Sequence, residues 1–94
     1  MKDLQAEIIQ VYGKVQGVFY RKSTQAEANQ LGLCGWVKNR EDGSVEIFAE
    51  GSLIQIEALK KWCKKGPAQA EVQEIISQSA EAQFYKSFEI EYSH

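Results

Sequence analysis

Residues 13–21 read Gly13-Lys14-Val15-Gln16-Gly17-Val18-Phe19-Tyr20-Arg21, and this stretch joins a strand-like run to a helix-like run. The residues before it, from Ile8, are mostly apolar and include β-branched and aromatic side chains, as strands do. The residues after it, from Lys22 to Leu33, are rich in Ala, Gln and Glu, as helices are. A short loop with two glycines and one arginine therefore separates a strand from the start of a helix.

This loop has the features of a phosphate site. Glycine lets the backbone approach a ligand closely, the free N–H groups at a helix start attract an anion, and an arginine adds a fork of donors. A cation at a helix N-terminus also opposes the helix dipole by about 0.3–1 kcal/mol, a cost that a bound anion reverses. The loop alone is a weak indication, because Gly13 and Gly17 also suit a tight turn and Arg21 also suits a solvated surface.

Length and composition predict one domain, spanning residues 1–94. The net charge of −2 disfavours nucleic acid as a partner, because binding to a phosphate backbone usually requires a basic surface. No apolar run reaches the roughly 20 residues that cross a bilayer, and residues 1–7 lack the apolar segment of a secretory signal. We therefore expect a cytoplasmic protein with no membrane partner.

The cysteines and the histidine do not suggest a reactive centre. Cys34 and Cys63 lie far apart, and the single histidine is the last residue, His94. This spacing does not suit a metal site, and it disfavours a Ser-His-Asp arrangement. We expect two buried thiols in a reducing compartment, with a disulfide or redox role left open, and neither a metal nor a cofactor.

Hydrophobic periodicity predicts five strands, at 8–13, 35–40, 45–49, 70–76 and 84–92. An Asp42-Gly43 turn signal joins the second and third as a hairpin. In the fourth, Val72 and Ile76 are expected on one face, and residues 77–83 are expected to form a polar loop.

Two helices are predicted between these strands. The first stops before Gly32. Its start is open, since a capping-box pattern at Thr24 and Glu27 favours Thr24, whereas a phosphate loop favours Tyr20 or Arg21. The second follows Ser52, which forms a capping-box pattern with Gln55.

This order, β-α-β-β-α-β with an additional C-terminal strand, predicts an α+β fold, the ferredoxin-like α/β sandwich, with two helices on one face of an antiparallel sheet. In that topology the third strand pairs antiparallel between the first and second. The first and second then run parallel, and their C-terminal ends share one edge of the sheet. We therefore expect Asn39 near the glycine loop, although an asparagine there also suits a turn.

Together the two segments resemble a known family. Residues 13–21 resemble the first signature of the acylphosphatases, and residues 35–45, continuing to Gly51, resemble the second at a similar spacing. The resemblance extends over nearly the whole chain. Departures are minor: Tyr20 stands where the family often has Phe, and Lys14 where Arg or His is common.

The resemblance implies hydrolysis of the carboxyl–phosphate bond of acyl phosphates to a carboxylate and inorganic phosphate. We expect a monomer that acts on a small-molecule acyl phosphate, and because the leaving carboxylate departs without a general acid, the reaction requires no metal. In the family, the arginine matching Arg21 binds the phosphoryl oxygens together with backbone N–H groups, and the asparagine matching Asn39 orients the attacking water. The implied catalytic residues are Arg21 and Asn39, and the implied phosphate cradle is Val15, Gln16, Gly17, Val18, Phe19, Tyr20 and Arg21.

Other functions are less well supported by the sequence. A non-catalytic phosphate-binding or regulatory module of the same fold has no evident need for a water-positioning amide such as that of Asn39. An RNA-recognition module requires aromatic residues on its central strands and a basic face, whereas the chain is acidic. A metal carrier of this fold requires a CxxC sequence in the first loop, which is absent.

Overall fold

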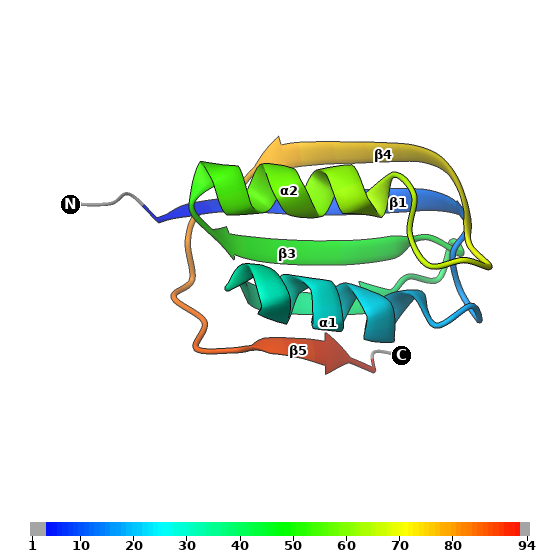
Figure 1. Ribbon diagram of the computed structural model, residues 1–94, viewed down its shortest axis with the longest axis horizontal. Coiled ribbons are helices and arrows are strands. Elements are labelled where there is room, and N and C mark those ends of the chain that lie inside the picture. The colour runs from blue at the N-terminus through cyan, green and yellow to red at the C-terminus, as the bar shows by residue number, and fades with distance from the viewer. Residues whose placement is uncertain (1–3, 93–94) are drawn as a thin grey trace.

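The computed structural model describes residues 4–92 and has two helices lying on one face of a five-stranded sheet (Figure 1). The predicted order of elements and the ferredoxin-like fold are confirmed. The elements are β1 (Gln5–Lys14), α1 (Tyr20–Leu31), β2 (Cys34–Asn39), β3 (Val45–Gly51), α2 (Leu53–Cys63), β4 (Glu71–Ser79) and β5 (Phe88–Glu91).

The strand order is β4-β1-β3-β2-β5, with β3 antiparallel to both β1 and β2. As expected, β1 and β2 therefore run parallel and end at the same edge, which lies at the right of Figure 1. The sheet is mixed, however, not antiparallel throughout, because β5 pairs parallel with β2. After β4, one edge strand, the chain passes to the other edge of the sheet and enters β5 at the end where β2 begins.

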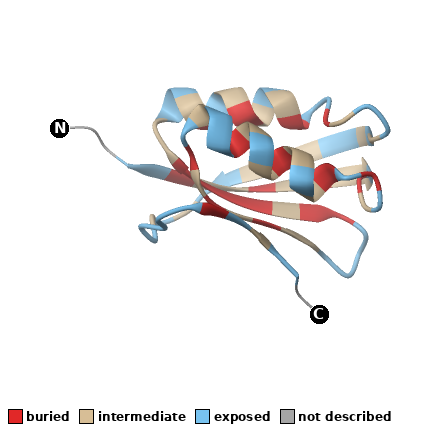
Figure 2. Cartoon of the chain, turned by 60° about the horizontal axis from the view of Figure 1, so that its bottom comes forward, coloured by how far each residue is buried: buried red, intermediate tan, exposed pale blue. Residues whose placement is uncertain are grey.

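The core lies between the helices and the sheet. Figure 2 shows the buried residues along the inner sides of the helices and along the strands beneath them. The helices contribute Ala28, Ile56, Leu59 and Cys63, each fully buried. The strands contribute Ile9, Val11, Val37, Val45, Ile47, Ala49 and Phe88.

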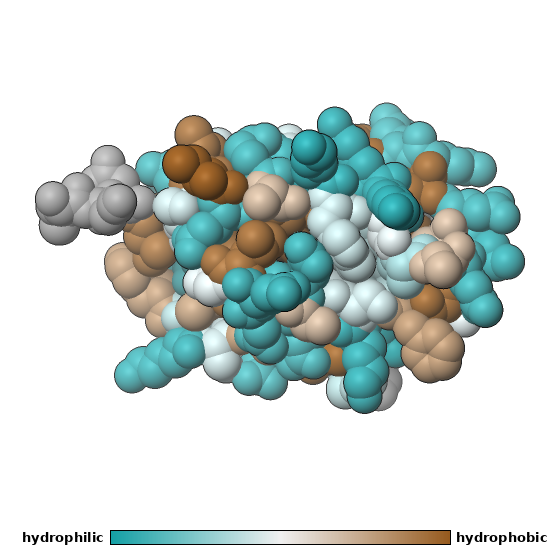
Figure 3. All heavy atoms as spheres, in the orientation of Figure 1, coloured by the Kyte–Doolittle hydropathy of each residue, from teal (hydrophilic) through white to brown (hydrophobic). Residues whose placement is uncertain are grey.

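The outer surface of the helix layer is mainly hydrophilic, with apolar side chains gathered toward the end where α2 begins (Figure 3). Leu53 and Ile54 in the first turn of α2 are exposed. This end of α2 lies opposite the edge where β1 and β2 terminate. The helices therefore bury one apolar stripe each against the sheet and leave the rest to solvent, as amphipathic helices do.

The two helix starts follow different rules. Ser52 caps α2 as predicted, accepting from the Gln55 N–H while the Gln55 side chain accepts from the Ser52 N–H. In contrast, α1 begins at Tyr20, and the capping-box pattern at Thr24 is wrong as a start signal. The Thr24 hydroxyl is buried inside the helix and donates to the Tyr20 carbonyl oxygen at 2.8 Å.

The fourth strand departs from the predicted pattern. Gly13 pairs with Val72, but Tyr12 pairs with Glu74, so Gln73 is an extra residue that forms a β-bulge. A bulge shifts the alternation of side chains by one position. Val72 and Ile75 therefore pack against the core, whereas Ile76, predicted on the face of Val72, is exposed.

Long-range pairing also moves strand ends. Strand β4 continues to Ser79, inside the stretch predicted as a loop, because Glu7 of β1 pairs with Ser79. The predicted strand at 84–92 contracts to β5. Before it, the buried carboxylate of Glu50 accepts the backbone N–H groups of Gln83, Phe84 and Tyr85, and this anchors the segment that leads into β5.

We expect Gly35→Ala to lower the free energy of unfolding by more than about 3 kcal/mol. Gly35 has φ +137°, and a Cβ there would overlap the carbonyl oxygen of Phe48 in the neighbouring strand. Gly43→Ala is the matched control: its φ is +92°, but nothing lies within 4 Å of the added Cβ, so only backbone strain of about 1 kcal/mol remains. Urea unfolding measures both, and equal losses would contradict the steric explanation.

Candidate active site

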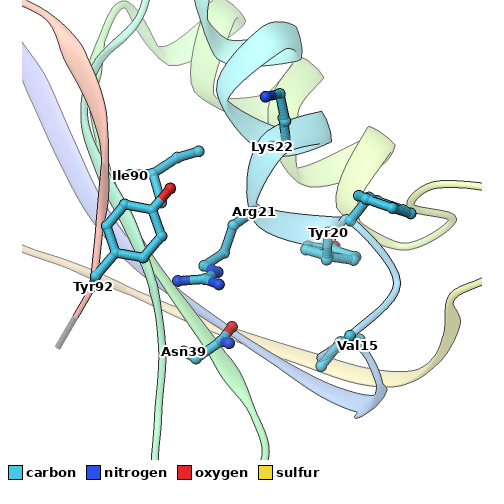
Figure 4. Close-up of a pocket in the computed structure, with 9 residues that line it drawn as sticks. Val15, Tyr20, Arg21, Lys22, Asn39, Ile90 and Tyr92 are labelled. Carbon is cyan, nitrogen blue, oxygen red and sulfur yellow. The ribbon is translucent and has the colours of Figure 1, made fainter. Parts of the chain in front are cut away.

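A pocket of about 310 Å³ opens at the edge where β1 and β2 end. Figure 4 shows side chains from three parts of the chain meeting there: the loop and first turn of α1, the end of β2, and the end of β5. The lining residues are Val15, Gly17, Phe19, Tyr20, Arg21, Lys22, Asn39, Ile90 and Tyr92.

The glycine loop is anchored by its apolar side chains and bent by two residues in the left-handed region. Val15 and Val18 are buried in the core. Gly17 has φ +76°, and Phe19, which is 76% exposed, has φ +63°. A phenylalanine in this conformation is uncommon, and here it stands between two buried residues, Val18 and Tyr20.

The first N–H groups of α1 lie outside the backbone hydrogen-bond ladder of the helix. The first bond of the helix runs from the Ser23 N–H to the Phe19 carbonyl oxygen at 3.0 Å. Phe19 supplies no side-chain cap, and the first turn contains no acidic residue. The N–H groups of Tyr20, Arg21 and Lys22 therefore precede the helical ladder, which is the arrangement that attracts an anion.

Arg21 and Asn39 meet in this pocket from different elements. Figure 4 shows the Arg21 guanidinium directed toward Asn39 and Tyr92, with Lys22 on the far side of Arg21 from Asn39. The guanidinium lies 4.8 Å from the centroid of the Tyr92 ring, within the range of a cation–π contact. Asn39 is the last residue of β2 and pairs with Val45 of β3.

The structure separates the seven residues of the expected cradle. Five line the pocket: Val15, Gly17, Phe19, Tyr20 and Arg21. Val18 is buried, and the Gln16 amide donates to the carbonyl oxygens of Arg40 and Ser44. Gly13 lies within β1 at the bulge, where a Cβ would overlap backbone atoms of β4.

Lys22, Ile90 and Tyr92 also line the pocket and were not predicted as site residues. Lys22 was inside the predicted helix, and nothing in its local pattern marks it. Ile90 and Tyr92 alternate with the buried Phe88, which places them on one face of the last strand. That pattern was visible in the sequence, but only the parallel pairing of β5 with β2 brings the face to the pocket.

The acylphosphatase family model matches residues 7–90. The chain belongs to the acylphosphatase family. An acylphosphatase of Marinobacter nauticus is 54% identical over 72 residues, which are 77% of this chain and 78% of the relative. The structure of an acylphosphatase from Coxiella burnetii matches with a TM-score of 0.91 and 37% identity over 95% of this chain and 94% of that one. The acylphosphatase from Bacillus subtilis gives a TM-score of 0.89 and 40% identity over 96% and 100%.

These comparisons confirm the predicted family and with it the prediction of a hydrolase. Within residues 4–92, no three His, Cys, Asp or Glu side chains gather as they would around a metal ion. Neither α1 nor α2, the two helices of that range, has the length and apolarity that crossing a membrane requires.

Tyr20, which lines the pocket, is buried in the core. Its hydroxyl donates to the Cys63 carbonyl oxygen at 2.8 Å, and its ring lies 5.6 Å from that of Trp62. Burial raises the pKa of the Tyr20 hydroxyl, and burial also raises the pKa of the Cys63 thiol to about 12. Both groups stay protonated at neutral pH. Both cysteines are free thiols, but the prediction that both are buried is wrong for Cys34, which is half-buried on β2.

Stability should therefore fall in alkali. The unfolded chain ionises Cys63 from pH about 9 and Tyr20 from about 10, whereas the folded chain holds both protons because each pKa is raised. The contribution of each group is present in full below those values. Above them it is lost by up to about 1.4 kcal/mol per pH unit and group.

Urea unfolding between pH 7.5 and pH 11 measures this slope. Cys63→Ala should flatten the profile above pH about 9, and Tyr20→Phe should flatten it above about 10. Each variant also loses stability at neutral pH, so the slopes and not the absolute values are compared. If the free energy of unfolding of both variants fell with pH as steeply as that of the parent, the loss in alkali could not be assigned to Cys63 and Tyr20.

Proposed function

We propose that this chain hydrolyses the carboxyl–phosphate bond of acyl phosphates by in-line attack of a water molecule, giving a carboxylate and inorganic phosphate. The observation that carries the proposal is the meeting of Arg21 and Asn39 in one pocket, at a helix start whose N-cap residue supplies no side-chain cap. The acylphosphatases to which this chain is similar support the same reaction.

Arg21 and the N–H groups at the start of α1 hold the phosphoryl group in this proposal. The guanidinium presents a planar fork of donors, and the helix start adds donors aligned with the positive end of the dipole. Phosphoryl transfer passes through a loose transition state whose charge spreads over the equatorial oxygens, so catalysis depends mainly on positioning and charge stabilisation. The pocket provides both with a small number of groups.

Asn39 positions the water. A neutral amide cannot act as a base near neutral pH, but its carbonyl oxygen accepts a hydrogen bond from water and its NH₂ group donates. A loose transition state makes little demand on a base, and an oxygen of the substrate phosphate takes the proton. The leaving carboxylate, whose conjugate acid has a pKa of about 4, departs without a general acid, and the scheme includes no metal or cofactor.

We also propose that residues 1–94 act as a single domain, as a monomer in the cytoplasm, on a small-molecule acyl phosphate. The single core shared by both helices and all five strands supports the first point. The others rest on the composition and on the family. A regulatory module that binds a phosphorylated ligand without turnover is the alternative, and the same assay distinguishes the two.

Turnover of benzoyl phosphate, followed by the loss of its ultraviolet absorbance in excess chelator, tests the proposal. The parent should turn over at the same rate with and without chelator. Arg21→Gln should lose both turnover and inhibition by inorganic phosphate, because it removes the charged fork. Asn39→Ala should lower kcat by about 10²-fold or more and leave inhibition by phosphate within about twofold of the parent.

Asn29→Ala, an exposed asparagine on α1, is the matched control and should keep full turnover. No turnover above the blank in the parent would overturn the enzymatic proposal in favour of the binding module. Loss of turnover in chelator would contradict a metal-free reaction. Loss of phosphate inhibition in Asn39→Ala would contradict the water-positioning role.

A further inference from the structure

One side chain of the glycine loop reaches the hairpin that carries Asn39. The Gln16 amide nitrogen donates to the carbonyl oxygen of Arg40 at 2.8 Å and to that of Ser44 at 2.9 Å. Arg40 follows Asn39 directly, and Ser44 precedes Val45, the partner of Asn39 in the β2–β3 ladder. We propose that Gln16 is a positioning residue, which fixes Asn39 relative to the phosphate held by the loop; this rests on the proposed function.

The turn that Gln16 contacts is already closed by its own bonds. The Arg40 N–H donates to the Ser44 carbonyl oxygen at 2.9 Å, and the Gly43 N–H donates to the Arg40 carbonyl oxygen at 3.2 Å. The Asp42 carboxylate accepts from the Ser44 N–H and hydroxyl at 2.9 and 2.6 Å. The two bonds from Gln16 go to the same carbonyl oxygens that close the turn, so they both limit the opening of the turn and fix where it sits relative to the loop.

Backbone pairing does not provide that connection. The ladder between β1 and β3 ends at Val11 and Val45, so the chain beyond Val11 leaves the hairpin before it reaches the loop. The loop then passes through two left-handed residues, Gly17 and Phe19. Gln16 spans the gap between these two parts, and a shift of about 1 Å between reacting groups is enough to cost orders of magnitude in rate.

The chemistry of the side chain matches this task. A primary amide carries two N–H donors on one nitrogen, which is what two neighbouring carbonyl oxygens require. Methionine has a similar length and no donor. Glutamate has the same shape but, when ionised, only accepts, so it would place a negative charge against two carbonyl oxygens.

Gln16→Met tests the proposal in the same benzoyl phosphate assay. We expect kcat to fall on the order of tenfold, with inhibition by phosphate changed less than twofold. In the Asn39→Ala background the same change should cost no further kcat. Gln55→Met is the control at the opposite end of the molecule from the pocket. It removes a side-chain amide hydrogen bond to the Leu31 carbonyl oxygen at 2.8 Å together with the capping bond from the Ser52 N–H, and it should lower stability without changing kcat or KM.

Gln16→Glu adds a readout that a purely structural role would not move. Its kcat relative to the parent should be low at pH 7 and rise as the pH falls toward about 4.3, because the protonated acid regains one donor. Amide hydrogen exchange of Arg40 and Gly43 should also be faster in Gln16→Met than in the parent, independently of activity.

Unchanged kcat and unchanged exchange in Gln16→Met would overturn the positioning role. The role would also be overturned if the double variant lost kcat by the product of the two single-variant factors, because Gln16 would then act independently of Asn39. Failure of the proposed function has a different signature: no turnover in the parent, or full turnover in Asn39→Ala, with exchange at Arg40 and Gly43 still responding to Gln16→Met.

Discussion

The antiparallel pairing of β3 with both of its neighbours is the constraint on which the rest of the molecule depends. It forces β1 and β2 to run in the same direction, with one strand between them. Parallel strands end at the same edge, so the loop after β1 and the asparagine at the end of β2 lie together. Neither segment contains the proposed site alone, since the proposed phosphate cradle lies in the loop and the proposed water-positioning amide lies on β2.

The part of the pocket formed by Ile90 and Tyr92 depends on how the chain reaches β5. Glu50, at the far end of β3, accepts three backbone N–H groups of residues 83–85. Its burial would be costly without those partners. With them, the carboxylate fixes the point at which the crossing chain joins β2, and the parallel register of Lys38 with Glu91 follows. Tyr92 then comes next to Arg21.

The sequence allowed prediction of β3 between β1 and β2 and of the proximity of Arg21 and Asn39, because both follow from the order of elements. It did not place β5 beside β2. It did not allow prediction of the bulge at Gln73, since a bulge depends on which partner strand pairs there and leaves no local mark. The sequence left the first residue of α1 undecided for a related reason. The local capping rule favoured Thr24, whereas the anchoring of Val15 and Val18 in the core favours Tyr20.

The role of Gln16 shows another limit of sequence reasoning. As part of the loop signature it was grouped with the phosphate cradle, but its side chain faces the hairpin. A motif identifies which residues act together without saying which atoms each one contacts. Only the bond partners separate a residue of the pocket lining from one that connects the loop to the hairpin.

The start of α1 breaks several rules that stabilise helices elsewhere in the same chain. Ser52 caps α2 through a capping box, and Lys60 and Lys61 lie near its C-terminus, where cations are favourable. At α1 the cap position is a phenylalanine in the left-handed region that supplies no side-chain cap, and two cations, Arg21 and Lys22, occupy the first turn. Left-handed backbone at a non-glycine residue costs of order 1–3 kcal/mol, and each of these cations costs a few tenths more. A phosphate bound there would accept hydrogen bonds from the N–H groups and from the guanidinium together. The free energy lost at this helix start in the absence of a ligand would therefore be recovered when an anion binds.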